Sequence, residues 1–354
     1  MRLRDRDYAV SREGLIFRVL GYEHPPFHCF CDPEYAPSSL FHSSNPRAPR
    51  IRKDGSLFYK FYFDEGIHFV KERYPQYLLH SDTLNATLVG LSHDQIDLVR
   101  HPEDRLAEIL EGTGRDRLTQ LLVEVVDSIT ERSRLRPSDF GVFGSILHDF
   151  HHSDYSDLDL TIYGRASVGE LTDLLGTFHS EVRNPIRNEF DLWDELSSRK
   201  HWAFSEYTLD EYAWHQRRKR IYSIYVGEKM CRRVAVEFEP VRRWDEIGTG
   251  FDPTVKVRRV GWLKAVATIL DDEDSFFMPS IYRVRVERVL DGSPVFDVDT
   301  ITSYVEEYRM QARKGETVVV AGNLEEVESS GGSHKQITLT YGPRYFEQLL
   351  KVLR

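Results

Sequence analysis

Two short motifs, separated by eleven residues, carry the residue types needed to bind a phosphate and a metal ion. Gly144 and Ser145 follow the apolar run 140–143, and Asp157 and Asp159 alternate with leucines. Glycine lets the backbone approach a ligand closely, and the unpaired N–H groups at a helix start suit a phosphate. Because side chains alternate along a strand, both aspartates would lie on one face, where two oxygen ligands suit Mg²⁺.

A third carboxylate is available on a later segment, Arg-Val-Ala-Val-Glu-Phe-Glu-Pro at 233–240. Its valines and phenylalanine alternate with Ala235, Glu237 and Glu239, so the pattern predicts a strand with one apolar and one acidic face. We expect Pro240 to end this strand or to place it at a sheet edge, because proline cannot donate a ladder hydrogen bond. Both glutamates are candidates to join the two aspartates.

The two motifs together resemble the signature of the nucleotidyltransferase superfamily, in which an apolar residue and Gly-Ser precede Asp-apolar-Asp. This superfamily includes DNA polymerase beta, CCA-adding enzymes and poly(A) polymerases. The resemblance covers roughly residues 115–243, and the full chain also resembles a group of archaeal predicted nucleotidyltransferases. It implies that Asp157, Asp159 and a third carboxylate bind two Mg²⁺ ions, or Mn²⁺. It also implies that Gly144 and Ser145 hold the triphosphate of an NTP, and that Asp159 can accept a proton.

The resemblance favours Glu237 as the third carboxylate, because in CCA-adding enzymes the third aspartate commonly stands three residues before a proline. Glu239 lies on the same face and remains an alternative. The family usually has aspartate here, so a glutamate, one methylene longer, leaves the metal geometry open. Each motif alone could be a common turn or a solvated strand face; their order, with the later acidic strand, favours a site.

The surrounding sequence predicts the elements that would position these motifs. Helical spacing predicts a helix over 115–133, directly before the strand that leads to Gly144; the apolar positions are Leu118, Leu121, Leu122, Val125, Val126 and Ile129. Capping signatures predict helices that begin at Ser92, Ser167 and Thr208. A helix over 102–111 is expected to end at Gly112. Strands are predicted at 14–20, 57–63 and 221–226, and a polar insertion is predicted at 183–203.

The length of 354 residues is enough for two or three domains. We predict an α+β multidomain chain with an N-terminal α/β domain at 1–112 and a polymerase-beta-like core, a mixed sheet with helices, at 113–248. From 255 to 354 we predict a small OB-like β-barrel. Its predicted strands lie at 262–270, 281–290, 304–312, 317–327 and 336–341. Such barrels often bind oligonucleotides, although a fold alone does not establish a function.

Composition narrows the class of protein. A net charge of −10 argues against non-specific coating of nucleic acid, although it leaves room for a local basic surface. No apolar stretch approaches the length of a membrane span, and no apolar region follows the charged N-terminus as in a secretory signal. Three cysteines cannot form a disulfide framework. We therefore expect a cytoplasmic protein with no membrane partner.

Other chemically suitable residues have structural alternatives. The basic run 217–220 could contact phosphates or could be a solvated helix end, and the two interpretations are equally good. Aromatic and basic residues at 304–314 could stack bases or form ordinary strand faces; they are Tyr304, Tyr308, Arg309, Arg313 and Lys314. Loop residues before Asp157 are expected to be mostly exposed, namely His148, Asp149, His151 and His152. A zinc site is disfavoured because only one close ligand pair is clear among His24, His28, Cys29, Cys31 and His42.

The sequence thus predicts a metal-dependent transfer of NMP from an NTP to an acceptor hydroxyl, with release of pyrophosphate. RNA with a tRNA-like 3′ end is the first expectation for the acceptor. An AMP-transferring enzyme that acts on a protein or a small molecule is an alternative. A third hypothesis is an RNA-binding or nucleotide-binding protein that keeps the fold without catalysis. The sequence indicates neither the base preference nor the oligomeric state.

Overall fold

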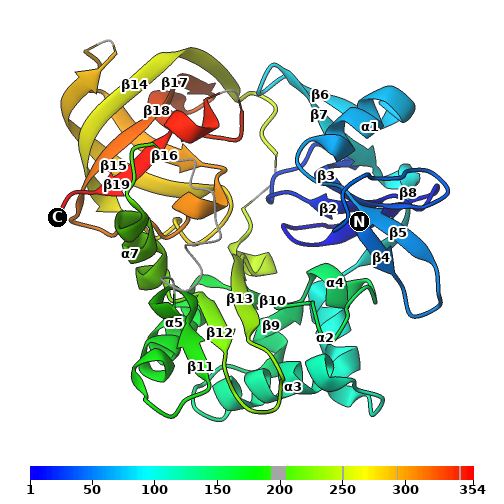
Figure 1. Ribbon diagram of the computed structural model, residues 1–354. Coiled ribbons are helices and arrows are strands. Elements are labelled where there is room, and N and C mark those ends of the chain that lie inside the picture. The colour runs from blue at the N-terminus through cyan, green and yellow to red at the C-terminus, as the bar shows by residue number, and fades with distance from the viewer. Residues whose placement is uncertain (193–204, 249–250, 293, 343) are drawn as a thin grey trace. The chain divides into compact units, whose positions relative to one another are not determined.

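The computed structural model describes residues 1–354 except 193–204, 249–250, 293 and 343 (Figure 1). The chain forms two compact units. The first contains Met1–Ser81, Thr87–Arg187 and Ser223–Phe251, and the second contains Asp82–Ala86, Asn188–Tyr222 and Asp252–Arg354. Both contain strands, and most of the described helices belong to the first, so the chain is of the mixed α+β class. None of the described helices is long and apolar enough to span a bilayer.

The first unit begins with an eight-stranded sheet. Its strand order is β4-β5-β3-β2-β1-β8, and β7 pairs with β3 and β6. The strands are β1 (Tyr8–Ser11), β2 (Ile16–Val19), β3 (His28–Pro37), β4 (Pro49–Ile51), β5 (Leu57–Lys60), β6 (Leu78–Ser81), β7 (Ala86–Ser92) and β8 (Ile96–Arg100). Helix α1 (Glu65–Arg73) packs on β3. The predicted strands at 14–20 and 57–63 are therefore present, although each is shorter than expected.

The helix predicted to begin at Ser92 is wrong. Ser92 and Gln95 do form a capping box, but it closes only the 3₁₀ turn His93–Gln95, and β8 follows at once. Strand β8 pairs antiparallel with β1, with Ala9 opposite Val99. Pairing with β1 therefore overrides the local helix signal, which three residues alone cannot sustain.

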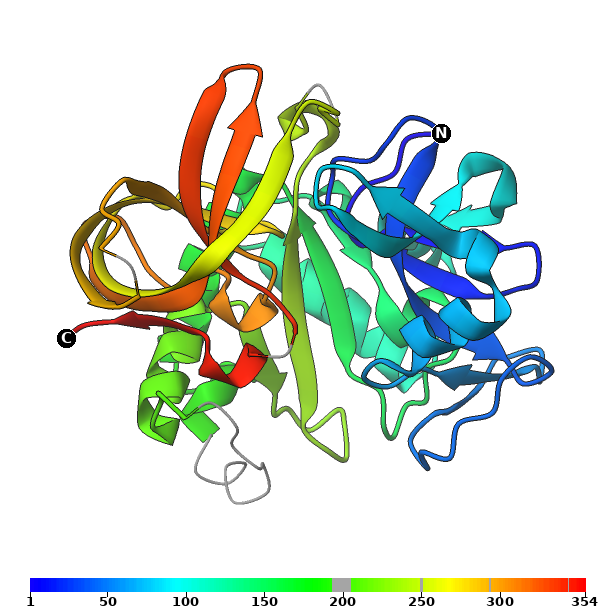
Figure 2. The ribbon, with the colours of Figure 1, turned by 90° about the horizontal axis from the view of Figure 1, so that it is seen from above.

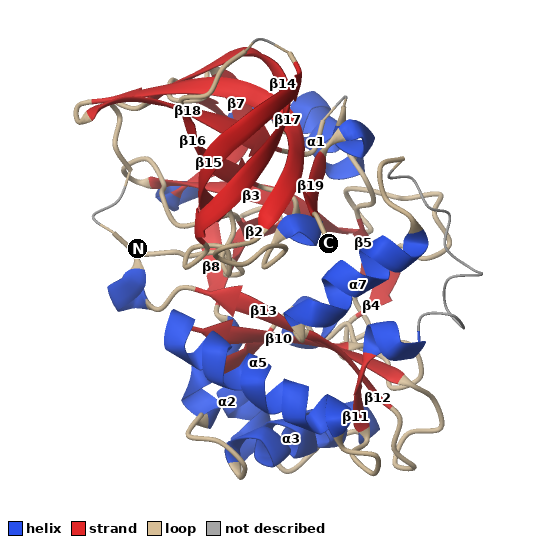
Figure 3. Ribbon diagram, turned by 90° about the vertical axis from the view of Figure 1, so that its left-hand side faces the viewer, coloured by secondary structure: helices blue, strands red, loops and turns tan. Residues whose placement is uncertain are grey.

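A second, five-stranded sheet carries the predicted motifs. Its order is β11-β12-β13-β10-β9, from strands β9 (Phe140–Val142), β10 (Leu158–Tyr163), β11 (Ile186–Asn188), β12 (Tyr222–Tyr225) and β13 (Val234–Val241). The unit also holds helices α2 (Pro102–Glu111), α3 (Arg117–Thr130), α4 (Gly144–Leu147) and α5 (Arg165–Ser180). Figure 3 shows α3 and α5 on the same side of β10 and β13. The fully buried residues of these strands, such as Leu160 and Phe238, form the apolar face.

The helix predicted over 115–133 is confirmed as α3, which Asp116 caps by accepting hydrogen bonds from the Leu118 and Thr119 N–H groups at 2.9 and 3.0 Å. The helix expected at Ser167 instead begins at Arg165. Gly164 precedes it with φ +95°, where a Cβ would collide with the Arg243 side chain. The glycine, rather than the capping signature, therefore sets the start of α5.

The expectation for Pro240 needs correction. Strand β13 continues past it to Val241 and lies between β12 and β10, so it is not an edge strand. In the β10–β13 pairing, Pro240 stands opposite Ile162 and Val241 opposite Tyr163, so the strand continues through the proline.

The polar insertion predicted at 183–203 falls partly outside the described residues. Its last eleven positions, 193–203, belong to the undescribed range 193–204. The described part contains β11 and the 3₁₀ turn Glu189–Leu192. Its first residues therefore extend the second sheet of the first unit, which the polar composition did not suggest.

The second unit contains helix α7 (Leu209–Lys219) and a six-stranded sheet. The strands are β14 (Lys256–Asp271), β15 (Ser280–Asp291), β16 (Val298–Ser303), β17 (Thr317–Ser329), β18 (Gly332–Leu339) and β19 (Leu349–Val352). Pairing runs β14-β15-β16-β18-β17, and β17 also pairs with β14, so these five strands form a closed ring of pairings. The hairpin of β17 and β18 is visible at the top of Figure 2. Thr208 caps α7 as expected, and the Val352 N–H donates to His215 Nε2 at 3.1 Å.

The strand predicted at 304–312 is wrong. Strand β16 lies earlier and ends at Ser303, whose hydroxyl accepts from the Val305 N–H at 3.1 Å. A 3₁₀ turn, Glu306–Tyr308, follows. The actual strand contains threonines at 300 and 302 and an aspartate at 299, which weakened its apolar signal. Strand β19 was not expected.

Candidate active site

The predicted carboxylates lie on two adjacent parallel strands of the first unit. In the β10–β13 pairing, Asp159 stands opposite Glu237. Paired residues on neighbouring parallel strands project to the same face, about 4.8 Å apart along the hydrogen-bonding direction. Asp157 lies two residues before Asp159 and therefore shares that face. The fold brings the three residues together on the side of the sheet opposite the apolar face.

The Gly-Ser turn lies against one of these carboxylates. Gly144 has φ +62°, and a Cβ placed there would lie 2.5 Å from Asp159 Oδ2. The Phe143 N–H also donates to the Asp159 carbonyl at 2.9 Å. No residue with a side chain could hold this backbone so close to the carboxylate, which gives a physical reason for glycine at this position.

The helix after the turn is shorter than a phosphate-binding helix usually is. Helix α4 contains only Gly144–Leu147 and ends at His148. Its aligned peptide dipoles are too few to add much positive potential. Any phosphate here would depend on individual backbone N–H groups of the turn and on the hydroxyl of Ser145, which is half-buried.

Asp159 lies in an unusual electrostatic environment. Burial and, next, the neighbouring Asp157 carboxylate raise the pKa of Asp159 to about 7. Lys60, on β5 of the N-terminal sheet, acts in the opposite direction, and its ammonium lies 3.6 Å from Glu34. Two adjacent carboxylates repel each other when both are ionised. A nearby divalent cation offsets this repulsion and favours the ionised form of both.

Glu239, the alternative third carboxylate, is occupied elsewhere. Its Oε2 lies 2.9 Å from Arg6 Nη2, and both side chains are buried. Arg6 comes from the N-terminal segment, which therefore covers this end of β13. Glu237 is only half-buried and is the glutamate in register with Asp159. The geometry thus distinguishes the two glutamates: one stabilises the packing, whereas the other lies beside the aspartates.

Asp157 is held by Arg232, a residue that the sequence did not single out. Arg232 Nη1 lies 3.5 Å from Asp157 Oδ1, and the Ala235 N–H donates to the same oxygen at 3.3 Å. Arg232 Nη2 also donates to the Ser153 and Ser156 carbonyls. The guanidinium therefore fixes both the carboxylate and the loop before it. The signal in the sequence was an arginine just before β13, one of many in the chain.

The three carboxylates do not converge on one point. Across the described residues, the only set of three potential ligands whose donor atoms lie within 4.8 Å of one another is Asp7, His101 and Glu103. That set is engaged internally: His101 Nδ1 lies 3.0 Å from Asp7 Oδ1, and Arg4 lies 2.5 Å from Glu103. The ligands of a single ion must converge on one point, but two metal ions typically lie ~3.5–4 Å apart, so the ligands of a pair can be spread more widely. The predicted trio is chemically suited to such a pair, since all three are oxygen donors on one face.

Most of the loop residues expected to be exposed are not. His148 is fully buried among Tyr8, Tyr35 and Phe150, with ring centroids 4.6, 5.5 and 5.6 Å away. Burial lowers the pKa of His148 to about 3, so it is neutral. Asp149 pairs with Arg105 at 2.5 Å.

The remaining loop histidines differ from each other. The side chain of His151 is buried, and its Nε2 lies 2.8 Å from Asp116 Oδ2. His152 alone of the four loop residues is exposed. The expectation failed for His148 because Tyr8 and Tyr35 of the N-terminal sheet pack against it, and for His151 because it contacts the cap of α3. Local sequence encodes neither contact.

The basic run 217–220 lies largely within the packing of the second unit. Lys219 is buried and donates to the Glu307 carbonyl at 2.6 Å. Arg218 pairs with Glu316 at 2.5 Å, and Arg217 pairs with Asp191 at 2.7 Å. These contacts favour the structural interpretation of the run over phosphate binding.

The aromatic and basic residues at 304–314 also serve packing in part. Tyr308 and Arg309 are buried, and Arg313 donates to the Arg218 carbonyl at 3.1 Å. Tyr304 is exposed. Because its members differ in this way, the set does not form a continuous stacking surface.

Cys29 and Cys31, from the disfavoured zinc set, are free thiols in the core of the N-terminal sheet. Both lie at buried positions that alternate along β3, so they face the same side of the strand. Their neighbours in this core are apolar, among them Phe17 and Leu91. The third cysteine, Cys231, is an exposed thiol.

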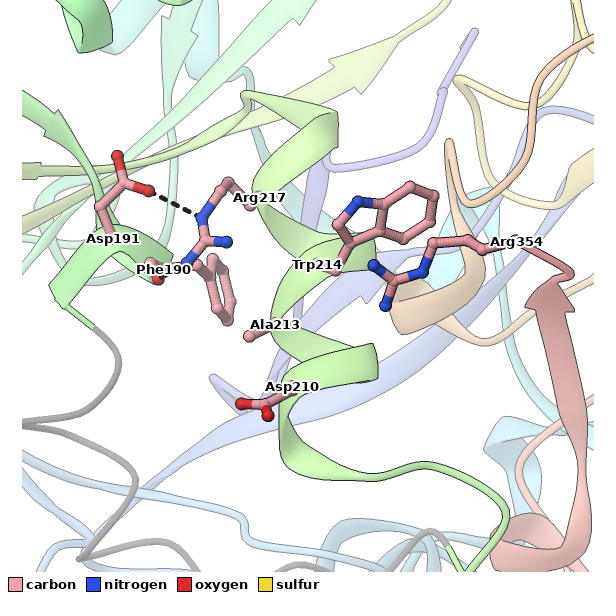
Figure 4. Close-up of a pocket in the computed structure, with 7 residues that line it drawn as sticks. All are labelled: Phe190, Asp191, Asp210, Ala213, Trp214, Arg217 and Arg354. Atoms are coloured by element: carbon pink, nitrogen blue, oxygen red, sulfur yellow. Dashed lines mark hydrogen bonds and ion pairs between the residues drawn. The ribbon is translucent and has the colours of Figure 1, made fainter.

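A pocket of about 250 Å³ in the second unit contains neither the predicted carboxylates nor the Gly-Ser turn (Figure 4). It is lined by Phe190, Asp191, Asp210, Ala213, Trp214, Arg217 and Arg354. Most of its charged groups have partners in the lining itself: Asp191 pairs with Arg217, and the Arg354 guanidinium lies 4.5 Å from the Trp214 ring centroid. This pairing leaves little charge with which to recognise a ligand.

The chain is similar over its whole length to a protein of Methanocaldococcus jannaschii described as uncharacterized protein MJ1086. The two are 24% identical over 365 residues, which cover all of both chains. No family model matches the chain, and no solved structure matches it significantly. The similarity therefore extends through both units but brings no activity with it.

Proposed function

We propose that the protein is a metal-dependent nucleotidyltransferase, which transfers NMP from an NTP to an acceptor hydroxyl and releases pyrophosphate. The observation that carries the proposal is the register of Asp159 with Glu237, on the face that also bears Asp157. The approach of Gly144 to the Asp159 carboxylate adds to it. The Gly-Ser turn, the aspartate pair and the acidic strand are separate segments of the sequence, and packing alone gives no reason for them to meet in this way.

Asp157, Asp159 and Glu237 would hold Mg²⁺, or Mn²⁺, through carboxylate oxygens. When bound, such ions lower the pKa of an acceptor hydroxyl and neutralise charge that develops on a leaving pyrophosphate. The protein's own share of catalysis is to position the reactants and to stabilise charge that develops in the transition state.

The residues of the turn and of β10 have distinct proposed roles. Backbone N–H groups at Gly144 and Ser145, with the Ser145 hydroxyl, would hold the triphosphate. Asp159 would accept the proton of the acceptor hydroxyl, as the resemblance to nucleotidyltransferases implies. The acceptor oxygen then forms a bond to the α-phosphorus while the bond from that phosphorus to the bridging oxygen breaks, and the electron pair leaves with pyrophosphate.

RNA with a tRNA-like 3′ end is the acceptor that we propose first. The closed ring of five strands in the second unit resembles an OB-fold barrel, a common binder of oligonucleotides. Arg283 and Arg285 are exposed on β15 of this ring, although Asp299 and Glu287 lie 3.8 and 3.0 Å from them.

The test is incubation of the protein with each labelled NTP, Mg²⁺ and total RNA. The Asp157→Ala/Asp159→Ala variant is the negative control, and Asp97→Ala, which changes an exposed carboxylate on β8, is the matched control. Label on RNA in the wild type and in Asp97→Ala, but not in the double variant, supports the proposal. RNA with a blocked 3′ hydroxyl should accept no label.

Two other outcomes correspond to the alternative functions. Label on protein or on a small molecule would favour an AMP-transferring enzyme. Tight RNA or nucleotide binding without metal-dependent transfer to any of these acceptors would favour a non-catalytic binding protein. Transfer that persists in the double variant would refute the assignment of the aspartates.

A further inference from the structure

The loop between α4 and Asp157 presents a stacked aromatic pair. The rings of His152 and Tyr155 lie 4.8 Å apart between centroids, with an interplanar angle of 26°. Tyr155 is 80% exposed, although a tyrosine ring in a folded protein usually buries most of its surface. One face of the Tyr155 ring therefore lies against His152, and most of the remaining ring surface is open to solvent.

Several hydrogen bonds give this loop a defined conformation. The Tyr155 and Ser156 N–H groups both donate to the His152 carbonyl, at 3.1 and 2.9 Å, and the His152 N–H donates to Ser156 Oγ at 3.0 Å. At the start of the loop, His151 is joined to Asp116, the cap of α3. The ring pair is thus held in place before any ligand binds, which lowers the entropy cost of using it.

The same loop is fixed beside a proposed metal ligand. The Arg232 guanidinium contacts the carbonyls of Ser153 and Ser156 and lies 3.5 Å from Asp157 Oδ1. Tyr155 lies between these two serines in the chain. A single guanidinium therefore links the loop that carries the ring to the carboxylate.

We infer that Tyr155, backed by His152, is a stacking platform for the base of the incoming nucleotide. The inference rests on the proposed function. Tyr155 lies two residues before Asp157, and Arg232 joins its loop to that carboxylate, so the ring lies near a proposed ligand of the metal that would bind the triphosphate. An aromatic face accepts every base, so the platform would add affinity with little base preference.

The test compares binding of two ligands by calorimetry in the presence of Mg²⁺. One is an ATP analogue with a methylene between the α- and β-phosphorus atoms, which cannot be turned over, and the other is tripolyphosphate, which has no base. Tyr155→Ala should weaken binding of the analogue about fivefold or more and leave tripolyphosphate unchanged. Tyr155→Phe should retain wild-type affinity for both. Phe63→Ala, which removes a fully exposed aromatic ring from another loop of the first unit, is the matched control.

Each result supports or overturns the platform. Loss of affinity for the analogue alone supports it. Equal affinities of Tyr155→Ala and the wild type for the analogue overturn it, while the proposed function stands if the wild type binds both ligands. If Tyr155→Ala weakens binding of an RNA oligonucleotide but not of the analogue, the assignment to the incoming nucleotide is overturned. The ring would then stack on a base of the acceptor. If the wild type binds neither the analogue, tripolyphosphate nor RNA, the platform and the proposed function both fail.

Discussion

Replacement of Asp159 by asparagine should stabilise the metal-free protein at neutral and alkaline pH. The pKa of Asp159 rises from an ordinary value of 3.8 to about 7, first through burial and then through Asp157. Since the folded state binds this proton more tightly than the unfolded state, stability falls as the pH rises from about 4 to about 7. Asparagine is close in shape to the protonated acid and does not ionise, so Asp159→Asn should not show this fall in stability with rising pH.

The magnitude follows from the size of the shift. Each pKa unit corresponds to about 1.4 kcal/mol, so an upward shift of about three units sets an upper limit of roughly 4 kcal/mol. Rotation of the Asp157 carboxylate and entry of water reduce this limit. We therefore expect Asp159→Asn to raise the free energy of unfolding by about 2 kcal/mol at alkaline pH. For a unit of this size, about 2 to 4 °C accompanies each kcal/mol, which gives an increase in Tm of about 4 to 8 °C at pH 8.

The assay is thermal unfolding of the wild type, Asp159→Asn and the matched control Asp97→Asn, an exposed carboxylate on β8, over a pH series from acidic to mildly alkaline in EDTA. The difference between Asp159→Asn and the wild type should be near zero at the acidic end and largest at the alkaline end. Mg²⁺ should stabilise the wild type at alkaline pH and have little effect on Asp159→Asn. A difference that does not change with pH would refute the electrostatic argument.

Three further predictions concern single residues of the two units. Glu237→Ala should abolish metal-dependent transfer, because it removes a proposed metal ligand in register with Asp159. Glu239→Ala should lower stability by about 2 kcal/mol, because it removes the nearer of two carboxylates beside the buried Arg6, at 2.9 Å against 3.7 Å for Asp5; thermal unfolding beside the transfer assay measures both effects. Gly144→Ala should lower transfer about tenfold or more, because its Cβ would collide with Asp159; wild-type rates would contradict this. Lys219→Ala should destabilise the second unit by about 2 kcal/mol through loss of a buried hydrogen bond, measured by amide hydrogen exchange of β17 against β10.

The elements nearest the candidate site were the easiest to predict from the sequence. Helix α3 has a continuous apolar stripe and an aspartate cap, and β10 begins with a strict alternation, so local pattern and tertiary packing agree. The site strands could be predicted because each needs an apolar face against the helices. The shared face of Asp157 and Asp159 then follows from the period of two.

Other features depended on contacts between distant segments. Ser92–Gln95 carries a complete helix-capping pattern, yet pairing with β1 makes the following residues a strand. Likewise, His148 is polar and follows a turn, and only the N-terminal sheet, which packs over the loop, explains its burial. Period and capping rules act over a few residues and carry no information on such partners.

The choice between Glu237 and Glu239 shows how tertiary structure adds chemical meaning to an ambiguous pattern. Along β13 the two are equivalent, because both lie on the acidic face and both precede Pro240. Arg6 removes the equivalence: it comes from the distant N-terminus and neutralises one glutamate in a buried pair, while the other remains beside Asp159. A buried arginine at this place would also limit how far a metal site could extend along the strands. The N-terminal segment therefore helps to define the candidate site, and its removal should disturb metal binding even though it supplies none of the three proposed ligands.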